Sequence, residues 1–201
     1  DCVQYYLKPK EEEQYYSHKY DSDILKPMRW FHNAIKRKLI LDATNGKSGL
    51  KLLDTAGGQG GDINKWIDAN ISEVLFVEFN KKNITNPDDG AQARYNSLKD
   101  KLKITFINGD STKEYKNGDA GIDFNNKYKL KQYYANLPNN GEEYFDIVSC
   151  QFAIHYFFKD VSRTDSLETF ISNVSYALKD GGVFIGTTLD GEKVYNKLKD
   201  S

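Results

Sequence analysis

The chain has few residues of the types that build disulfide-rich, metal-binding or membrane-spanning proteins. Only two of its 201 residues are cysteines, Cys2 and Cys150, and their wide separation predicts neither a disulfide framework nor a metal site. Cys150 lies in an apolar run, which predicts a buried small side chain rather than a reactive thiol. No apolar run approaches the roughly 20 residues that span a bilayer, and the first residues lack the apolar core of a signal peptide. We therefore expect a soluble, intracellular protein without a metal ion.

An excess of charge of one sign is also missing. The 28 lysines and arginines almost balance the 29 aspartates and glutamates, which gives a net charge of −1. The net charge therefore argues against binding of a nucleic acid through an overall positive charge. A local basic groove is still compatible with this composition. The length suffices for one sizeable domain with its own core.

Short apolar runs, typical of buried strands, alternate with segments of helical period. We expect strands at residues 50–54, 74–78, 104–107, 145–150 and 183–187. We expect helices from Met28 onward and at residues 59–69, 91–101 and 163–179, with a short helix near 127–137 in the polar stretch 112–143. Such alternation predicts an α/β domain with one doubly wound, mainly parallel sheet. Residues 1–27 would form an N-terminal arm and residues 28–201 the domain.

A glycine-rich turn after the first strand is the most informative local feature. The chain reads LLDTAGGQGGD over residues 52–62. Glycines allow a sharp turn and a close approach of the backbone to a ligand. The spacing is neither G-x-G-x-x-G nor a P-loop, so a dinucleotide or a cradled phosphate is disfavoured. Asp54 ahead of the glycines suits a ligand with a cationic amino group, for which S-adenosylmethionine is the leading candidate, although an acidic residue there can also cap the next helix.

Polar side chains also end the second and third strands, at the edge of the sheet where ligands bind in such folds. Glu78 follows the glycine turn by about 20 residues, the position from which a carboxylate accepts hydrogen bonds from ribose hydroxyls. The alternative is that Glu78 is only a solvated charge at the end of a strand. Asp110 and Ser111 could contact an adenine, although Asn-Gly-Asp-Ser is equally good turn composition.

The string DIVSCQFAIHY at residues 146–156 is the most specific motif. His155 alone would more often be structural, but the whole string resembles the methyltransferase domain of mRNA cap guanine-N7 methyltransferases. Three further stretches resemble that family: MRWFHNAIK at 28–36, the glycine turn followed by Lys65-Trp66, and GGVFIGTT at 181–188. The Phe-His-Asn string and the TLDG ending at 188–191 are similar to the branch found in the capping enzymes of large DNA viruses.

The resemblance implies a class I, Rossmann-like, S-adenosylmethionine-dependent methyltransferase that methylates N7 of the guanine cap of mRNA. It implies no catalytic general base, because N7 has a free lone pair and the sulfonium is already activated. The implied cofactor ligands are Asn33, Lys36, Asp54, Ala56, Gly57, Gly58, Asp62, Glu78, Asp110, Ser111, Gln151 and Tyr156. His155 and Tyr156 would line the guanine pocket, and Tyr5 or Tyr6 would pack on the base.

Further implications concern partners and location. The partner is the capped 5′ end of RNA, with triphosphatase and guanylyltransferase domains fused or associated, and no membrane. The protein would be cytoplasmic if viral and nuclear if cellular. Family members continue beyond the last strand, so we expect a natural C-terminal extension of several dozen residues that completes the cap pocket.

The chain departs from the family pattern at three positions. Ala56 replaces a glycine that faces the cofactor, Gln59 replaces a lysine, and Glu78 replaces the commoner aspartate. We expect the Ala56 methyl group to tighten the cofactor pocket. Two alternatives stay open: a catalytically silent methyltransferase-like module that acts as a binding or scaffold partner, and a class I methyltransferase with a small-molecule or protein substrate.

Overall fold

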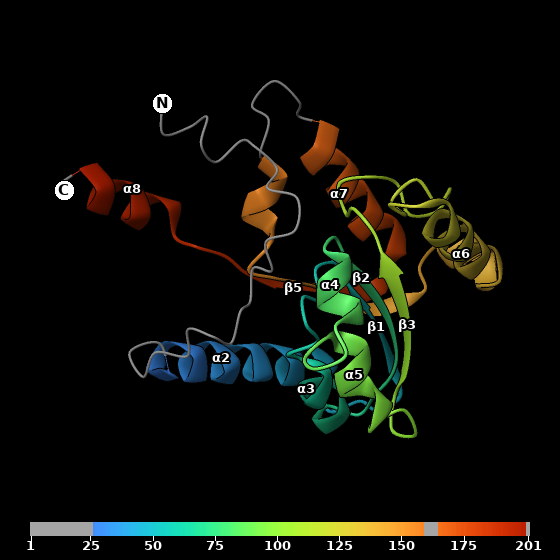
Figure 1. Ribbon diagram of the computed structural model, residues 1–201, viewed down its shortest axis with the longest axis horizontal. Coiled ribbons are helices and arrows are strands. Elements are labelled where there is room, and N and C mark those ends of the chain that lie inside the picture. Colours follow the sequence, from blue (N-terminus) through green and yellow to red (C-terminus); the bar gives the residue numbers. More distant parts are fainter. Residues whose placement is uncertain (1–25, 159–164, 200–201) are drawn as a thin grey trace.

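The computed structural model describes residues 26–158 and 165–199 (Figure 1). Tyr5 and Tyr6, with nearly all of the expected arm, lie outside the described residues. Five strands form one sheet in the order β3-β2-β1-β4-β5, and every neighbouring pair is parallel. The strands are β1 (Leu50–Asp54), β2 (Ile71–Glu78), β3 (Lys103–Asn108), β4 (Phe145–Gln151) and β5 (Leu178–Thr187). The predicted single parallel sheet is confirmed.

Helices pack on both faces of this sheet (Figure 1). Among the described residues the helices are, in chain order, α2 (Lys26–Thr44), α3 (Ile63–Asp68), α4 (Lys81–Thr85), α5 (Ala91–Asn96), α6 (Phe124–Ala135), α7 (Asp165–Ala177) and α8 (Gly191–Lys199), with the 3₁₀ turns η3 (Pro138–Gly141) and η4 (Ile154–Phe158). Helix α8 lies apart from the sheet and has no buried residue (Figure 1). Leu130 of α6 and Phe170 of α7 share one core cluster with strand residues. Ile40 of α2 and Trp66 of α3 belong to the cluster on the other face. The sheet is therefore doubly wound, as predicted.

Strand order fixes where a ligand can enter. The chain runs outward from β1 through β2 to β3 and then returns to β4 on the other side of β1. Ligands of open parallel sheets bind beyond the carboxyl ends of the strands at such a reversal. The ends of β1, β2 and β4 are therefore the expected floor of the site.

Several predicted boundaries are wrong. The helix expected from residue 59 begins at Ile63, because the glycine turn continues to that point, with positive φ angles at Gly58 and Gly60. Helix α4 was not expected; it is a five-residue helix capped by the Asn80 side chain, which accepts a hydrogen bond from Lys82 N. The helix expected to reach residue 101 ends at Asn96. Strand β5 begins at Leu178, where the expected helix had not yet ended.

Cys150 is fully buried and unpaired in β4. The prediction of a buried cysteine is confirmed, and burial raises the pKa of its thiol to about 11. Within residues 26–158 and 165–199, no helix is both long and apolar enough to cross a membrane. The same residues contain no group of three metal-ligating side chains.

Candidate functional site

The glycine turn crosses the carboxyl ends of β1 and β2, and its shape depends on missing side chains. A Cβ atom at Gly57 would lie 2.1 Å from Cε2 of Phe76, a β2 residue. Gly57 N donates a hydrogen bond to Val77 O at 3.0 Å, which fastens the turn to β2. Gly60 has a φ angle of 74°, in the left-handed region that favours glycine. The turn therefore brings bare backbone to the edge where a ligand would bind.

Glu78 points its carboxylate at this turn. Its Oε2 accepts a hydrogen bond from Gly58 N at 2.8 Å. Its Oε1 accepts from Asn80 N at 2.8 Å and from Asn83 Nδ2 at 3.1 Å. The side chain is buried, and burial raises the pKa of its carboxyl group while these hydrogen bonds lower it. Glu78 therefore lies beside the glycine turn, and its contact with a ribose stays a prediction.

A group of charged side chains lies beneath the turn. Asp62 Oδ1 lies 2.7 Å from Lys36 Nζ and 2.8 Å from Lys65 Nζ. Lys65 also donates to Gly61 O at 2.7 Å, and burial lowers the pKa of its ammonium group. The residues predicted on α2, β1 and the turn are thus brought together, and Lys36 links the leading helix to the site.

Asp54 is fully enclosed in this group and forms no ion pair within the described part of the chain. Ala56 N donates to its Oδ1 at 3.3 Å. Burial, followed by repulsion from Asp62, raises the pKa of the Asp54 carboxyl group to about 8. A buried carboxyl of this kind fits a ligand that brings a positive charge, because the cation would stabilise the ionised form. The amino group and the sulfonium of S-adenosylmethionine meet this requirement.

Asp110 and Ser111 differ in their positions after β3. Asp110 is partly exposed, and its Oδ1 accepts hydrogen bonds from the backbone N and the hydroxyl of Thr112. Ser111 is buried, and its hydroxyl donates to Thr55 O and accepts from the Tyr115 hydroxyl. The Ser111 side chain is therefore engaged inside the protein, whereas Asp110 lies at the edge. The adenine contacts predicted for both stay predictions.

Sequence reasoning missed an exposed apolar group beside Glu78. Phe79 follows the carboxylate directly and exposes 66% of its surface, and Ile122 exposes 46%. Asn108 joins the two, because its Nδ2 donates to Phe79 O at 2.7 Å and its carbonyl accepts from Ile122 N at 3.0 Å. An exposed ring at this edge is a natural stacking surface for a flat base. The sequence signal was present, since an aromatic residue directly follows the strand-end acid.

The segment after β4 contacts α2 through Phe152, and His155 and Tyr156 follow it on η4. The rings of His32 and Phe152 lie 4.6 Å apart, and those of His155 and Tyr156 lie 4.2 Å apart on η4. His155 Nδ1 is buried without a hydrogen-bond partner among the described residues. Asn33 is exposed on α2, one turn before the lysine that reaches Asp62.

Two further predicted ligands are engaged within the protein. Gln151 Nε2 donates to Ser149 Oγ at 3.1 Å, and Gln151 Oε1 accepts from the Thr187 hydroxyl at 2.9 Å. Ala56 is partly buried and packs against the core cluster that contains Phe170. The cofactor contacts of Gln151 and Ala56, and the expected tightening of the pocket, stay predictions.

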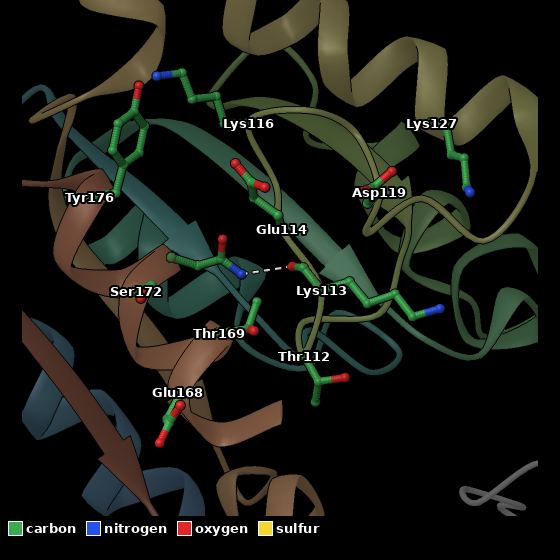
Figure 2. Close-up of a pocket in the computed structure, with 11 residues that line it drawn as sticks. Thr112, Lys113, Glu114, Lys116, Asp119, Lys127, Glu168, Thr169, Ser172 and Tyr176 are labelled. Atoms are coloured by element: carbon green, nitrogen blue, oxygen red, sulfur yellow. Dashed lines mark hydrogen bonds between the residues drawn. The ribbon is translucent and has the colours of Figure 1, made fainter. Parts of the chain in front are cut away.

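A cavity of about 880 Å³ lies elsewhere, between α7, the start of α6 and the loop that follows β3 (Figure 2). Its wall is polar and includes Lys113, Lys116 and Lys127. Asn173 Nδ2 donates to Lys113 O at 2.7 Å and so holds the loop against α7 (Figure 2). None of the predicted cofactor ligands lines this cavity. The candidate cofactor site is therefore the one at the glycine turn.

Comparisons with known proteins agree with this geometry. Residues 2–201 match the mRNA (guanine-N(7))-methyltransferase domain family. The chain is 33% identical over 181 residues to the "Probable mRNA-capping enzyme" of Acanthamoeba polyphaga mimivirus, an alignment that covers 86% of this chain and 14% of that protein. It is 34% identical over 172 residues to the mRNA cap guanine-N(7) methyltransferase of Caenorhabditis briggsae, which covers 83% of this chain and 40% of that protein.

A solved structure also shares the fold. The PH0226 protein from Pyrococcus horikoshii OT3 superposes with a TM-score of 0.51 and 21% identity, over 98% of this chain and 70% of that chain. The chain spans less than half the length of either sequence relative. The family match nevertheless extends over almost every residue. This chain therefore belongs to the mRNA (guanine-N(7))-methyltransferase domain family and has the fold of the class I S-adenosylmethionine-dependent methyltransferases.

Proposed function

We propose that this chain transfers the methyl group of S-adenosylmethionine to N7 of the guanine cap at the 5′ end of RNA. The observation that carries the proposal is the family match over residues 2–201. The positions of Asp54, Glu78 and His155 around one edge of the sheet support it.

The residues of the chain would act by binding and orienting. Bound S-adenosylmethionine supplies the activated methyl group. Asp54 faces its positive charge, Glu78 accepts from its ribose, and Phe79 stacks on its base. His155 and Tyr156 hold the guanine so that N7 points at the methyl group. Because the N7 lone pair needs no deprotonation, positioning is the main contribution, which reaches roughly 7–11 kcal/mol in intramolecular models.

The decisive experiment compares methyl acceptors. We expect a purified protein that contains this domain to transfer radiolabelled methyl groups to RNA ending in GpppG and not to the same RNA ending in a triphosphate. Free GTP and a mixture of small-molecule acceptors serve as controls for the small-molecule alternative. Binding of S-adenosylmethionine to residues 1–201, measured by calorimetry, tests the silent-module alternative separately. Equal transfer to capped and uncapped RNA would refute the cap assignment.

We also propose that the domain works within a larger capping assembly. The named capping enzyme of mimivirus supports this, because the aligned region is 14% of that protein. Affinity purification from the natural source should recover triphosphatase and guanylyltransferase activities with the methyltransferase. Recovery of the methyltransferase alone would contradict the proposal.

Replacing His155 with alanine should affect the RNA substrate more than the cofactor. Base-to-ring contacts are worth about 1–3 kcal/mol, so we expect kcat/KM for capped RNA to fall about 5- to 150-fold, with the Kd for S-adenosylmethionine unchanged within about twofold. Tyr195→Ala is the control, because Tyr195 is an exposed aromatic residue on α8. Equal losses of cofactor affinity and turnover would mean that His155 is structural.

Cofactor binding should release a proton from Asp54. Its carboxyl group has a pKa of about 8, so it is mostly protonated at pH 6.5, and a bound cation favours its ionised form. Affinity should therefore rise with pH toward 8, by at most about tenfold per unit. Calorimetry at pH 6.5 in buffers of different ionisation enthalpy should detect close to one released proton. Asp54→Asn should release none, and a parent protein that releases none would contradict the assignment.

A further inference from the structure

The carboxylate of Glu78 is held from two sides. Gly58 N, in the glycine turn, binds one oxygen. Asn80 N and Asn83 Nδ2, at the start of α4 and within it, bind the other. A carboxylate has about four lone-pair sites, so these three donors leave about one site open for a hydroxyl group of a ligand. The arrangement fixes both the position of the group and the plane in which it lies.

Asn83 is the donor in this set whose side chain could be replaced without changing the backbone. It is 3% exposed, and its Nδ2 lies 3.1 Å from Glu78 Oε1. The opposite end of its amide, Oδ1, is buried with no hydrogen-bond partner among the described residues. An unpaired buried carbonyl is destabilising. A side chain that served only for packing would not need this amide group. If the amide were rotated by 180°, its oxygen would face the Glu78 carboxylate and repel it.

The helix that carries Asn83 is itself fixed to the end of β2. Asn83 N donates to Asn80 O at 3.0 Å, and the Asn80 side chain caps α4 through Lys82 N. Ile84, the next residue, is buried in the core. Asn83 therefore approaches Glu78 from a rigid support rather than from a loose loop.

Glutamate at this position makes such a support necessary. The Glu78 side chain has one more methylene than an aspartate would have, which adds a rotatable bond that must be fixed before the carboxylate can serve as a precise acceptor. We propose that Asn83 is a positioning residue that holds the Glu78 carboxylate in the orientation needed to bind the ribose of S-adenosylmethionine. The inference rests on the proposed function and adds to it a residue that never touches the substrate.

The test is a double-mutant cycle with S-adenosylmethionine as the titrant. In the parent protein, Asn83→Ala should weaken binding about five- to tenfold. In a Glu78→Ala background the same change should have an effect of less than about twofold, because the group that Asn83 orients is gone. Asn64→Ala, an exposed asparagine on α3, is the control and should leave the Kd unchanged. Equal effects of Asn83→Ala in both backgrounds, or no effect in the parent, would overturn the proposal.

A second variant covers the case in which Asn83→Ala does not fold. Asn83→Asp keeps the shape and places a second carboxyl against Glu78, with Asp54 as the other carboxyl near it. The new pair should share a proton at low pH, which restores the hydrogen bond, and should repel at high pH. Cofactor affinity relative to the parent should therefore improve as the pH falls from 8 to 6. A constant ratio would refute the proposal. Full cofactor affinity in Glu78→Ala would instead refute the cofactor assignment itself.

Discussion

Gly57→Ala should lower the free energy of unfolding by about 3 kcal/mol, the upper end of the range for overpacked cores. The new methyl group would lie 2.1 Å from the Phe76 ring. That ring is fully buried, and it cannot move away because Phe106 and Trp66 pack against it, with ring centroids 5.0 and 6.4 Å distant. Urea unfolding measures the loss.

Gly61→Ala is a matched control within the same turn. A Cβ atom there would meet nothing within 4 Å. Its free energy of unfolding should stay within about 0.5 kcal/mol of the parent's, the usual range for surface changes. If the two variants unfolded at the same urea concentration, close packing of the turn on β2 would not be what requires glycine at position 57.

Glu78→Ala should weaken S-adenosylmethionine binding by about 1.5–3 kcal/mol, or roughly 10- to 150-fold in Kd, the value of hydrogen bonds to a charged acceptor. The change removes the proposed acceptor of the ribose and also leaves Gly58 N without the partner that it now has. Calorimetric titration gives the Kd, and thermal unfolding of the same sample reports any loss of structure.

Glu192→Ala provides the comparison, because Glu192 is exposed on α8, away from the glycine turn. It should bind the cofactor as the parent does. A Glu78→Ala protein with an unchanged Kd would show that this carboxylate does not contact the ribose, whatever else occupies the edge of the sheet.

The sheet could be predicted because each strand is a short apolar run that ends in a polar residue. The expected ends of β1 and β2 at Asp54 and Glu78 are correct. Helix α4 could not be predicted, because four of its five residues, KKNIT, are polar and helical order depends on a cap by Asn80 and on burial of Ile84. Tertiary packing rather than local propensity decides such a short segment.

The positions of the strand-end residues could be predicted from the sequence, but the directions of their side chains could not. A strand-end residue can be placed at the ligand edge from sequence, but whether its side chain faces the ligand depends on neighbours that are distant in the chain. Ser111 shows this, since Thr55 lies 56 positions earlier and still engages its hydroxyl. Asn83 could not be predicted either, because its importance comes from a hydrogen bond to Glu78 and not from any sequence motif.

The strand order also has a consequence for how the chain folds. Strands β1, β2 and β3 pair with neighbours in sequence, whereas the contact of β1 with β4 joins Lys51 N to Asp146, 95 positions apart. Closing so long a loop costs more entropy than forming the local pairs, and it is slow. We therefore expect the half of the sheet that carries the glycine turn and Glu78 to assemble first, with the His155 segment docking late. During synthesis on the ribosome, the half of the sheet with the glycine turn and Glu78 would emerge before the His155 segment has been made.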